Sequence, residues 1–280
     1  MSVAAAVLLG VVQGLTEFLP VSSSGHLSVI QNLFVTQASE NGHLLFDVLL
    51  HLGTLVSICA VYRKDIAEMA AELAGFFKSG SADPRRREVN KPNFARRLLI
   101  MTAASVIPLF AVIPVMKFTD MLFRSTVFVG IALIINGFVL FTADKIVPGR
   151  KSEKNMTLKD ALIVGLCQAV AVIPGISRSG ATIAGGLSRG LNREFSIKFS
   201  FLASIPAVLG ATLISIVNAF KGGAGLSDFM IYFFGAAVAA AVGFFAIKLL
   251  IRLALRGHFG KFAYYCWAVG FLTVIISLII

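Results

Sequence analysis

Two short polar runs interrupt an otherwise apolar chain. The first, EFLPVSSSGHL at 17–27, places a glutamate, three serines and a histidine around a proline, and the second, PGISRSGAT at 174–182, places Arg178 between two serines. Carboxylates, imidazoles and hydroxyls serve as general bases and nucleophiles. An arginine binds phosphate or carboxylate through two parallel N–H groups. Together the two runs predict a phosphate-binding site at which a group is transferred.

Each side chain in these runs has an expected role. Glu17 is predicted to act as a base or as a metal ligand, and Ser23, His26 or a water molecule is predicted to attack; the sequence leaves that choice open. Arg178 is predicted to bind the phosphate and to offset charge on the leaving group. The remaining predicted phosphate ligands are the hydroxyls of the two runs: Ser22, Ser24, Ser177, Ser179 and Thr182.

Two simpler interpretations stand beside these roles. A serine that precedes a helix commonly caps it, and this accounts for at least one of the serines at 22–24. An arginine in a membrane needs an anionic partner, and an internal ion pair between Arg178 and Glu17 would provide one. The N-terminus of a helix also attracts anions through its free N–H groups. Capping and phosphate binding are therefore compatible.

Three further polar residues are candidates for supporting roles. Gln13 lies one helical turn before Glu17, on the same face, and is predicted to assist it or to share a metal with it. Asp47 and His51 lie one turn apart in FDVLLHLGT at 46–54. They are predicted to orient the site from a neighbouring helix.

The composition indicates the kind of protein that must position these groups. Of the 280 residues, 57% are hydrophobic and only 14% are charged, and the mean hydropathy is +0.87. Soluble domains carry about 25% charged residues. We therefore predict one integral membrane domain over 1–280. The expected crossings are six long apolar stretches: 44–62, 98–116, 125–142, 199–220, 229–247 and 262–280.

The net charge of +11 has a simple explanation in a membrane protein, where Lys and Arg gather in the loops on one side. No basic stripe is interleaved with exposed aromatic residues, so no nucleic-acid partner is expected. The sequence contains no Walker, dinucleotide-binding or zinc motif, so ATP and dinucleotides are not indicated. The charged segment 64–78 is predicted to lie along the cytoplasmic surface as an amphipathic helix.

Two apolar regions do not fit the pattern of full crossings. Residues 2–35 break at Pro20, and residues 158–188 break at Pro174 and Gly175, which leaves each half too short to cross. We interpret both regions as re-entrant helix–loop–helix hairpins. With six transmembrane helices and two such hairpins, 21 of the 25 Lys and Arg residues fall on one side. The first hairpin then enters from the outside and the second from the cytoplasm.

An internal repeat supports this layout. Residues 6–27 align without a gap on residues 161–182, with six identities that include the pairs Gln13/Gln168 and Ser22/Ser177. We therefore predict an all-α polytopic membrane protein in an inverted-topology repeat, with halves at about 1–143 and 157–280. Inverted repeats with broken helices place a polar site near the middle of the membrane.

The runs QGLTEFLPVSSSGHL and PGISRSGAT resemble the two signature motifs of the undecaprenyl-diphosphatase family, the bacitracin-resistance type of bacterial membrane phosphatase, and the resemblance covers essentially the whole chain. It implies removal of the terminal phosphate from a C55 isoprenyl diphosphate at the outer face of the cytoplasmic membrane. The monophosphate then returns to the lipid-carrier cycle of peptidoglycan synthesis. The resemblance also implies a divalent cation, Mg or Ca, and a homodimer. Many members carry glutamate where this chain has Gln13, which leaves one fewer carboxylate for a metal.

Two other classes of protein compete with a phosphatase. A transporter for a lipid phosphate or another anion would use the same site without chemistry, because inverted repeats with broken helices are typical of transporters. A scaffolding membrane protein is the third class, but it leaves Glu17 and Arg178 unexplained. Release of free phosphate from a prenyl diphosphate separates the phosphatase from both.

Overall fold

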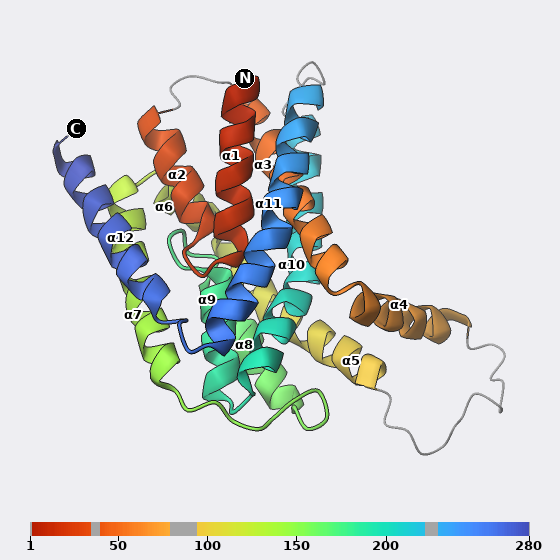
Figure 1. Ribbon diagram of the computed structural model, residues 1–280. Helices are drawn as coiled ribbons and strands as arrows, with labels where there is room; N and C mark the ends of the chain where they lie inside the picture. Colours follow the sequence, from red (N-terminus) through yellow and green to blue (C-terminus); the bar gives the residue numbers. More distant parts are fainter. Residues whose placement is uncertain (1, 35–39, 79–93, 222–228, 280) are drawn as a thin grey trace.

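The computed structural model describes residues 2–34, 40–78, 94–221 and 229–279 and shows an all-helical protein (Figure 1). Within those ranges the only β-type pairing is an isolated bridge between Lys151 and Leu191. A chain this apolar must satisfy its backbone N–H and C=O groups internally when it lies in lipid, and a helix does so within one segment. The predicted all-α class is confirmed.

Five helical stretches in the described ranges are long and apolar enough to cross a bilayer. A sixth is obtained if α3 (Glu40–Val61) is counted together with α4 (Arg63–Lys78). The protein is therefore a multi-pass membrane protein. The five stretches are Phe94–Pro114, made of α5 (Phe94–Val106) and the 3-10 helix η2 (Ile107–Val115), then α7 (Thr126–Lys145), α10 (Arg193–Lys221), α11 (Phe229–Leu255) and α12 (Lys261–Ile279).

Two local features depart from regular crossings. α4 turns away from α3 by 94°, and Figure 1 shows it pointing out from the lower half of the bundle. Lys198 of α10 pairs with Asp65 of α4 at 2.5 Å. The sequence predicted a surface helix at 64–78, and the bend supports that prediction. The 3-10 segment η2 was not predicted; it contains two prolines, which lack the N–H that an α-helix requires.

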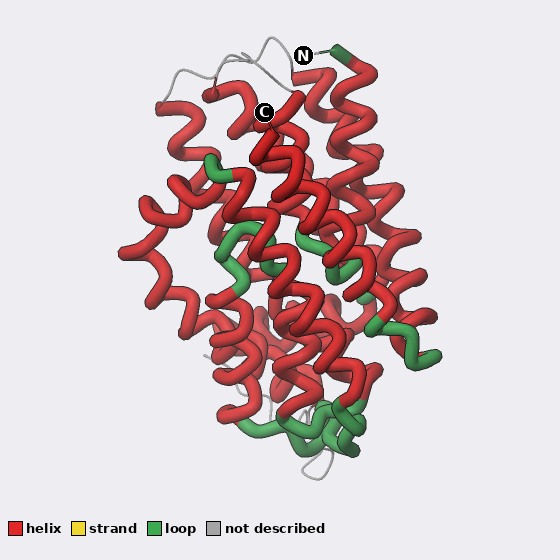
Figure 2. Tube along the Cα trace, turned by 90° about the vertical axis from the view of Figure 1, so that its left-hand side faces the viewer, coloured by secondary structure: helices red, strands yellow, loops and turns green. Residues whose placement is uncertain are grey.

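The two regions predicted as hairpins are both broken helices. The first consists of α1 (Val3–Phe18) and α2 (Ser23–Phe34), which lie in the upper half of Figure 1, and the second of α8 (Leu158–Val170) and α9 (Arg178–Ser188), in the lower half. The longest, α1, has 16 residues, or about 24 Å, against a hydrocarbon core of about 30 Å. Figure 2 shows loops at mid-height of the bundle. Each half-helix thus ends inside the protein.

Glycines hold the first broken helix in place. A Cβ on Gly10 would lie 2.5 Å from the carbonyl oxygen of Gly235, and one on Gly14 would lie 2.8 Å from that of Ala239. Only glycine allows the backbones of α1 and α11 to approach this closely, as at other packed membrane helices. The contact fixes the depth of the last turn of α1, which carries Glu17.

An ion-pair cluster holds the second broken helix at its base. The carboxylate of Asp160 is fully buried and accepts hydrogen bonds from Lys151 at 2.9 Å and from Arg189 at 3.0 Å. Thr157 caps α8, and its own N–H donates to Asp160. Because Arg189 follows the last residue of α9, this one carboxylate fastens both ends of the hairpin.

Candidate functional site

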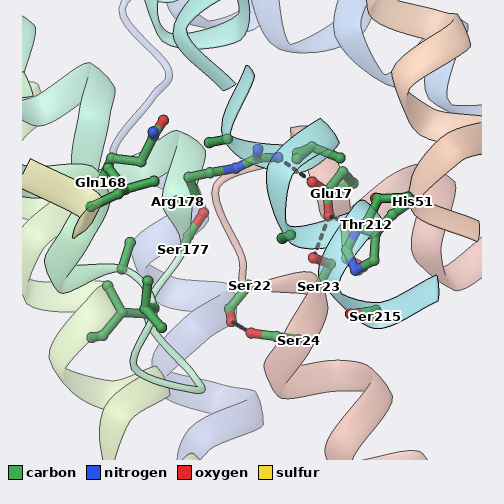
Figure 3. Close-up of a pocket in the computed structure, with 18 of the residues that line it drawn as sticks. Glu17, Ser22, Ser23, Ser24, His51, Gln168, Ser177, Arg178, Thr212 and Ser215 are labelled. Carbon is green, nitrogen blue, oxygen red and sulfur yellow. Dashed lines mark hydrogen bonds and ion pairs between the residues drawn. The ribbon is translucent and has the colours of Figure 1, made fainter. Parts of the chain in front are cut away.

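The two breaks open onto one cavity of about 320 Å³ (Figure 3). Its apolar side chains come from α10, from the second break and, with one residue each, from α3, η2 and α6 (Met116–Phe123). Its polar wall comes from both broken helices, α3 and α10, and consists of Thr16, Glu17, Ser22, Ser23, Ser24, His51, Gln168, Ser177, Arg178, Thr212 and Ser215. A pocket with one polar and one apolar wall suits an amphipathic ligand.

Glu17 is the centre of the polar wall. Its side chain is 5% exposed. Its Oε2 accepts a hydrogen bond from the hydroxyl of Ser23 at 2.6 Å and another from the amide nitrogen of Gln13 at 3.0 Å. That amide nitrogen also lies 3.1 Å from Nδ1 of His51. The predicted neighbours Gln13 and His51 are therefore in contact with each other and arranged around one carboxylate.

Arg178 brings the second break to the same carboxylate. Its Nη2 donates to Oε1 of Glu17, across 161 positions of sequence. The internal ion pair that the sequence left open is present. The arginine side chain is still 21% exposed and lines the cavity, so part of its guanidinium faces the space where a ligand would lie. Glu17 and Ser23 thus oppose Arg178 across the two breaks.

Both half-helices that follow the breaks begin with the same serine cap. The hydroxyl of Ser22 accepts from the N–H of Gly25 at 3.2 Å, and the hydroxyl of Ser177 accepts from the N–H of Gly180 at 3.2 Å. Each cap hydroxyl also pairs with the serine two positions on. Because one donor per helix is capped, the other free N–H groups at each N-terminus remain for an anion.

Backbone geometry at the first break is strained. Ser22 has a φ of 70°, a left-handed conformation that non-glycine residues adopt rarely. The aligned cap, Ser177, is also a serine but has an ordinary φ of −78°. The residue type alone therefore could not have predicted the left-handed conformation at Ser22. Such conformations persist where the surroundings enforce them, often at functional sites.

The two breaks also touch each other reciprocally. A Cβ on Gly25 would lie 3.2 Å from Cα of Gly175, and a Cβ on Gly180 would lie 3.3 Å from Cβ of Pro20. In the internal alignment Gly25 matches Gly180 and Pro20 matches Gly175. Each contact is thus the other one with the two halves exchanged, as at an interface with two-fold symmetry.

His26 does not join the cavity in this structure. Its Nδ1 lies 2.7 Å from the carbonyl oxygen of Ser22, and its Nε2 lies 2.9 Å from the hydroxyl of Tyr265 on α12. The two rings are stacked, with centroids 5.6 Å apart. The expectation that His26 lines the same cavity as Glu17 is therefore corrected, because its ring lies against Tyr265, outside the lining, and Nδ1 is engaged by the backbone of Ser22. Its catalytic role stays a prediction without geometric support.

Four other predicted residues also lie outside the cavity lining: Gln13, which reaches the site only through its bond to Glu17, and Thr182, Ser179 and Asp47. Thr182 is buried, and its hydroxyl contacts Ser200 on α10 at 2.6 Å and the carbonyl oxygen of Arg178 at 2.7 Å. Ser179 is 4% exposed and pairs with the cap Ser177. Asp47 lies on α3, one turn before His51, but is absent from the lining. These residues stand behind the site, whereas Ser22, Ser23, Ser24 and Ser177 face it.

Sequence reasoning missed four polar residues of the lining: Thr16, Gln168, Thr212 and Ser215. Gln168 of α8 lies in the cavity wall, and its buried amide has no hydrogen-bond partner among the described residues. The repeat aligns it with Gln13, which is a signal that was available. Thr212 and Ser215 of α10 gave only a weak signal, as two hydroxyls three positions apart in an apolar helix.

The residues present could hold a divalent cation together with substrate phosphates, but they do not form a complete metal site made of protein side chains alone. Across the described ranges, no group of three or more His, Cys, Asp or Glu side chains could hold a metal ion. Magnesium commonly binds one or two carboxylates and completes its shell with substrate phosphates and water. Glu17 offers such a carboxylate, and the Oε1 of Gln13 is buried without a partner among the described residues. The predicted metal role of both residues stays a prediction.

The fold and the cavity define a class: a polytopic helical membrane protein in which two broken helices enclose a site for an anionic, amphipathic ligand. Comparison with known sequences identifies the family. Residues 6–272 match the family described as "Bacitracin resistance protein BacA", and the chain belongs to that family.

Curated relatives match over the whole chain. The "Undecaprenyl-diphosphatase" of Alkaliphilus metalliredigens is 41% identical over 278 residues, which cover 98% of each chain. The protein of the same name from Methanosphaera stadtmanae is 39% identical over 285 positions and 100% of each chain. A third, from Desulforapulum autotrophicum, is 40% identical over 96% of each chain. The resemblance found from the two motifs is confirmed.

Proposed function

We propose that this protein hydrolyses undecaprenyl diphosphate to undecaprenyl phosphate and inorganic phosphate. The main support is that Glu17, Ser23 and Arg178 lie together in one cavity at the N-termini of two half-helices. A terminal phosphate needs donors and positive charge around its oxygens and a nucleophile at its phosphorus. The three side chains and the helix ends provide both. The names of the full-length relatives support the same reaction.

The geometry favours Ser23 as the nucleophile. Its hydroxyl already donates to Glu17 at 2.6 Å, so the carboxylate can take the proton as the oxygen attacks. A bond forms between Ser23 Oγ and the terminal phosphorus, and the bond from that phosphorus to the bridging oxygen breaks. The bridging oxygen keeps the electron pair and leaves with undecaprenyl phosphate.

The second half of the reaction uses the same two residues. Glu17 gives up its proton toward the departing monophosphate, and a water molecule then attacks the phosphoserine. Glu17 takes a proton from that water and passes it to Ser23 Oγ as the bond between Oγ and phosphorus breaks, so inorganic phosphate leaves and both side chains return to their starting states. Direct attack by a water molecule held between Glu17 and Ser23 is the one-step alternative, and detection of a phosphoserine separates the two.

Arg178 and the helix ends are assigned to the phosphate oxygens. The guanidinium pairs with Glu17 in the free protein, and the exposed part of the Arg178 side chain would contact the diphosphate. The N–H groups that begin α2 and α9 approach from opposite halves of the protein. Glu17, with Gln13 beside it, would hold a divalent cation against the diphosphate, and that cation would supply further neutralisation of the charge on the leaving group.

The apolar wall is assigned to the first isoprene units of the substrate. Leu109 of η2, Phe123 of α6, and Ala207, Val208 and Ala211 of α10 line this side. The 320 Å³ cavity holds only the beginning of a C55 chain. The rest of the tail would lie in the bilayer, which explains why a small pocket suffices for a large lipid.

We further propose the membrane topology as an inverted repeat of two re-entrant hairpins and six crossings, in the bacterial cytoplasmic membrane. The reciprocal contacts of the breaks support the repeat. Figure 1 shows α4 and the lower ends of α7, α9 and α11, which carry or adjoin the cation-rich segments, in the half that also contains the second hairpin. That half would face the cytoplasm, and the substrate would enter from outside. A homodimer remains part of the proposal.

Phosphate release from purified protein tests the function. With C55 diphosphate in detergent, the wild-type chain is expected to release phosphate. Arg178→Ala is expected to lose about 10³-fold in kcat/KM, because the negative charge that develops on the phosphate oxygens would no longer be stabilised by the guanidinium group. Arg178→Lys keeps the charge without the guanidinium group and should fall between the two. Wild-type protein that binds the lipid but releases no phosphate, yet moves it across vesicle membranes, would establish the transporter instead.

A further inference from the structure

One buried asparagine joins the two breaks. Asn136 lies in the middle of α7 and is completely buried. Its Nδ2 donates to the carbonyl oxygen of Pro20, in the first break, at 3.0 Å. Its Oδ1 accepts from the N–H of Ser177, in the second break, at 2.9 Å. Residues of the two signature runs also meet directly, through Arg178 and Glu17, but Asn136 belongs to neither run and bonds the backbone of both.

The two bonds of Asn136 join backbone groups that lie next to the proposed catalytic residues. Pro20 lies three positions after Glu17 and three before Ser23, so along the chain its carbonyl is between the base and the proposed nucleophile. Ser177 is the cap of α9 and precedes Arg178. One rigid amide, held on a continuous helix, therefore fixes the distance between the carboxylate half and the arginine half of the site.

The choice of an amide also has a physical reason. Pro20 offers an acceptor and Ser177 a donor, and only a side chain with one donor and one acceptor satisfies both. An apolar residue would leave both backbone groups without partners in a buried place, where each is costly. The remaining capacity of Nδ2 is directed toward Sγ of Cys266 on α12 at 3.4 Å, which further limits rotation of the amide.

We propose that Asn136 is a positioning residue, which holds the two half-sites in register by bonding Pro20 and Ser177 at once. The proposal rests on the proposed phosphatase function for its kinetic readout. Its structural readout is independent of catalysis. A shift of about 1 Å between reacting groups costs on the order of 10²-fold in rate, so a change far from the substrate is sufficient to affect kcat.

Two substitutions separate positioning from mere stability. Asn136→Leu removes both bonds and should lower kcat by about 10²-fold. Asn136→Asp keeps the shape, and the protonated acid both donates and accepts, whereas the ionised acid only accepts. Its kcat relative to wild type should therefore rise as pH falls. The matched control is Ser204→Ala, which removes a buried hydroxyl whose one bond within the described part of the chain goes to the carbonyl oxygen of Phe201 in its own helix.

Hydrogen exchange measured by mass spectrometry gives the readout that does not depend on activity. In Asn136→Leu, amides at 19–25 and 171–180 should exchange faster while the other helices stay as in wild type. Wild-type kcat in Asn136→Leu, a pH profile of Asn136→Asp parallel to wild type, or exchange raised evenly across the chain would each overturn the proposal. If wild-type protein releases no phosphate, the phosphatase function fails, and the exchange pattern still decides whether Asn136 sets the register.

Discussion

Replacing Glu17 by glutamine changes one atom of a side chain that makes three contacts. In the native site Oε1 faces Arg178, while Oε2 accepts from Ser23 and Gln13. A glutamine has one oxygen and one NH₂ group, so it can accept on only one of these sides. Whichever way the amide lies, its NH₂ meets either the guanidinium or the two donors at Ser23 and Gln13.

The magnitude follows from these contacts. Loss of the base that takes the proton of Ser23 should lower kcat by about 10²–10⁴-fold. Leaving Arg178 without its counter-ion should also lower stability, and removal of one partner from a buried ion pair costs roughly 3–5 kcal/mol. The arginine is one fifth exposed, so water screens part of this cost and the lower end of the range applies.

The assay combines initial rates of phosphate release with thermal unfolding in the same detergent. Gln13→Glu is a matched variant, since it adds a carboxylate one turn away without touching Arg178 directly, and it should keep measurable activity. If Glu17→Gln retains more than about a tenth of the wild-type kcat while folded, Glu17 is not the base and the assignment of Ser23 as nucleophile falls with it.

Two further predictions concern the neighbourhood of the site. Gly175→Ala should lower the free energy of unfolding by about 2–4 kcal/mol, because φ at this position is +96° and the new methyl group would lie 2.6 Å from Cβ of Ala132. The control is Gly210→Ala, where the new methyl group would have no atom within 4 Å. Equal thermal midpoints for the two variants would contradict the argument. Tyr265→Phe removes the hydroxyl group that contacts Nε2 of His26. It should lower the free energy of unfolding by about 1 kcal/mol and change kcat by less than about tenfold. A larger loss of kcat at unchanged stability would return His26 to the reaction.

The parts of the fold that could be predicted are those set by local chemistry. Proline and glycine at Pro20 and Gly175 end helices wherever they occur, and serines at Ser22 and Ser177 cap the helices that follow. Length and hydropathy predicted five of the six expected crossings because a helix must match the thickness of the bilayer, whereas the stretch at 44–62 passes the same test only together with the bent helix α4. The pairing of Glu17 with Arg178 was accessible as an alternative because an intramembrane charge needs a partner.

The parts that could not be predicted depend on the direction of side chains after assembly. His26 follows the break by a few residues, and a rotation of α2 decides whether its ring faces Glu17 or Tyr265. Asn136 was visible as one amide in an apolar crossing, but its partners lie 116 and 41 positions away. Thr212 likewise belongs to the cavity only through the way α10 packs.

The direct contact between the two interruptions has a consequence for the cell. Interrupted helices in the middle of a lipid layer create a hydrophilic spot within an electrical insulator, and protons follow such spots when they connect. Here the facing turns pack so closely at Gly25 and Gly175 that a methyl group on Gly25 would lie 3.2 Å from Cα of Gly175, and this point of contact has no room for a water molecule. This contact is therefore one physical barrier to proton flow between the hydrophilic spots that the two interruptions create.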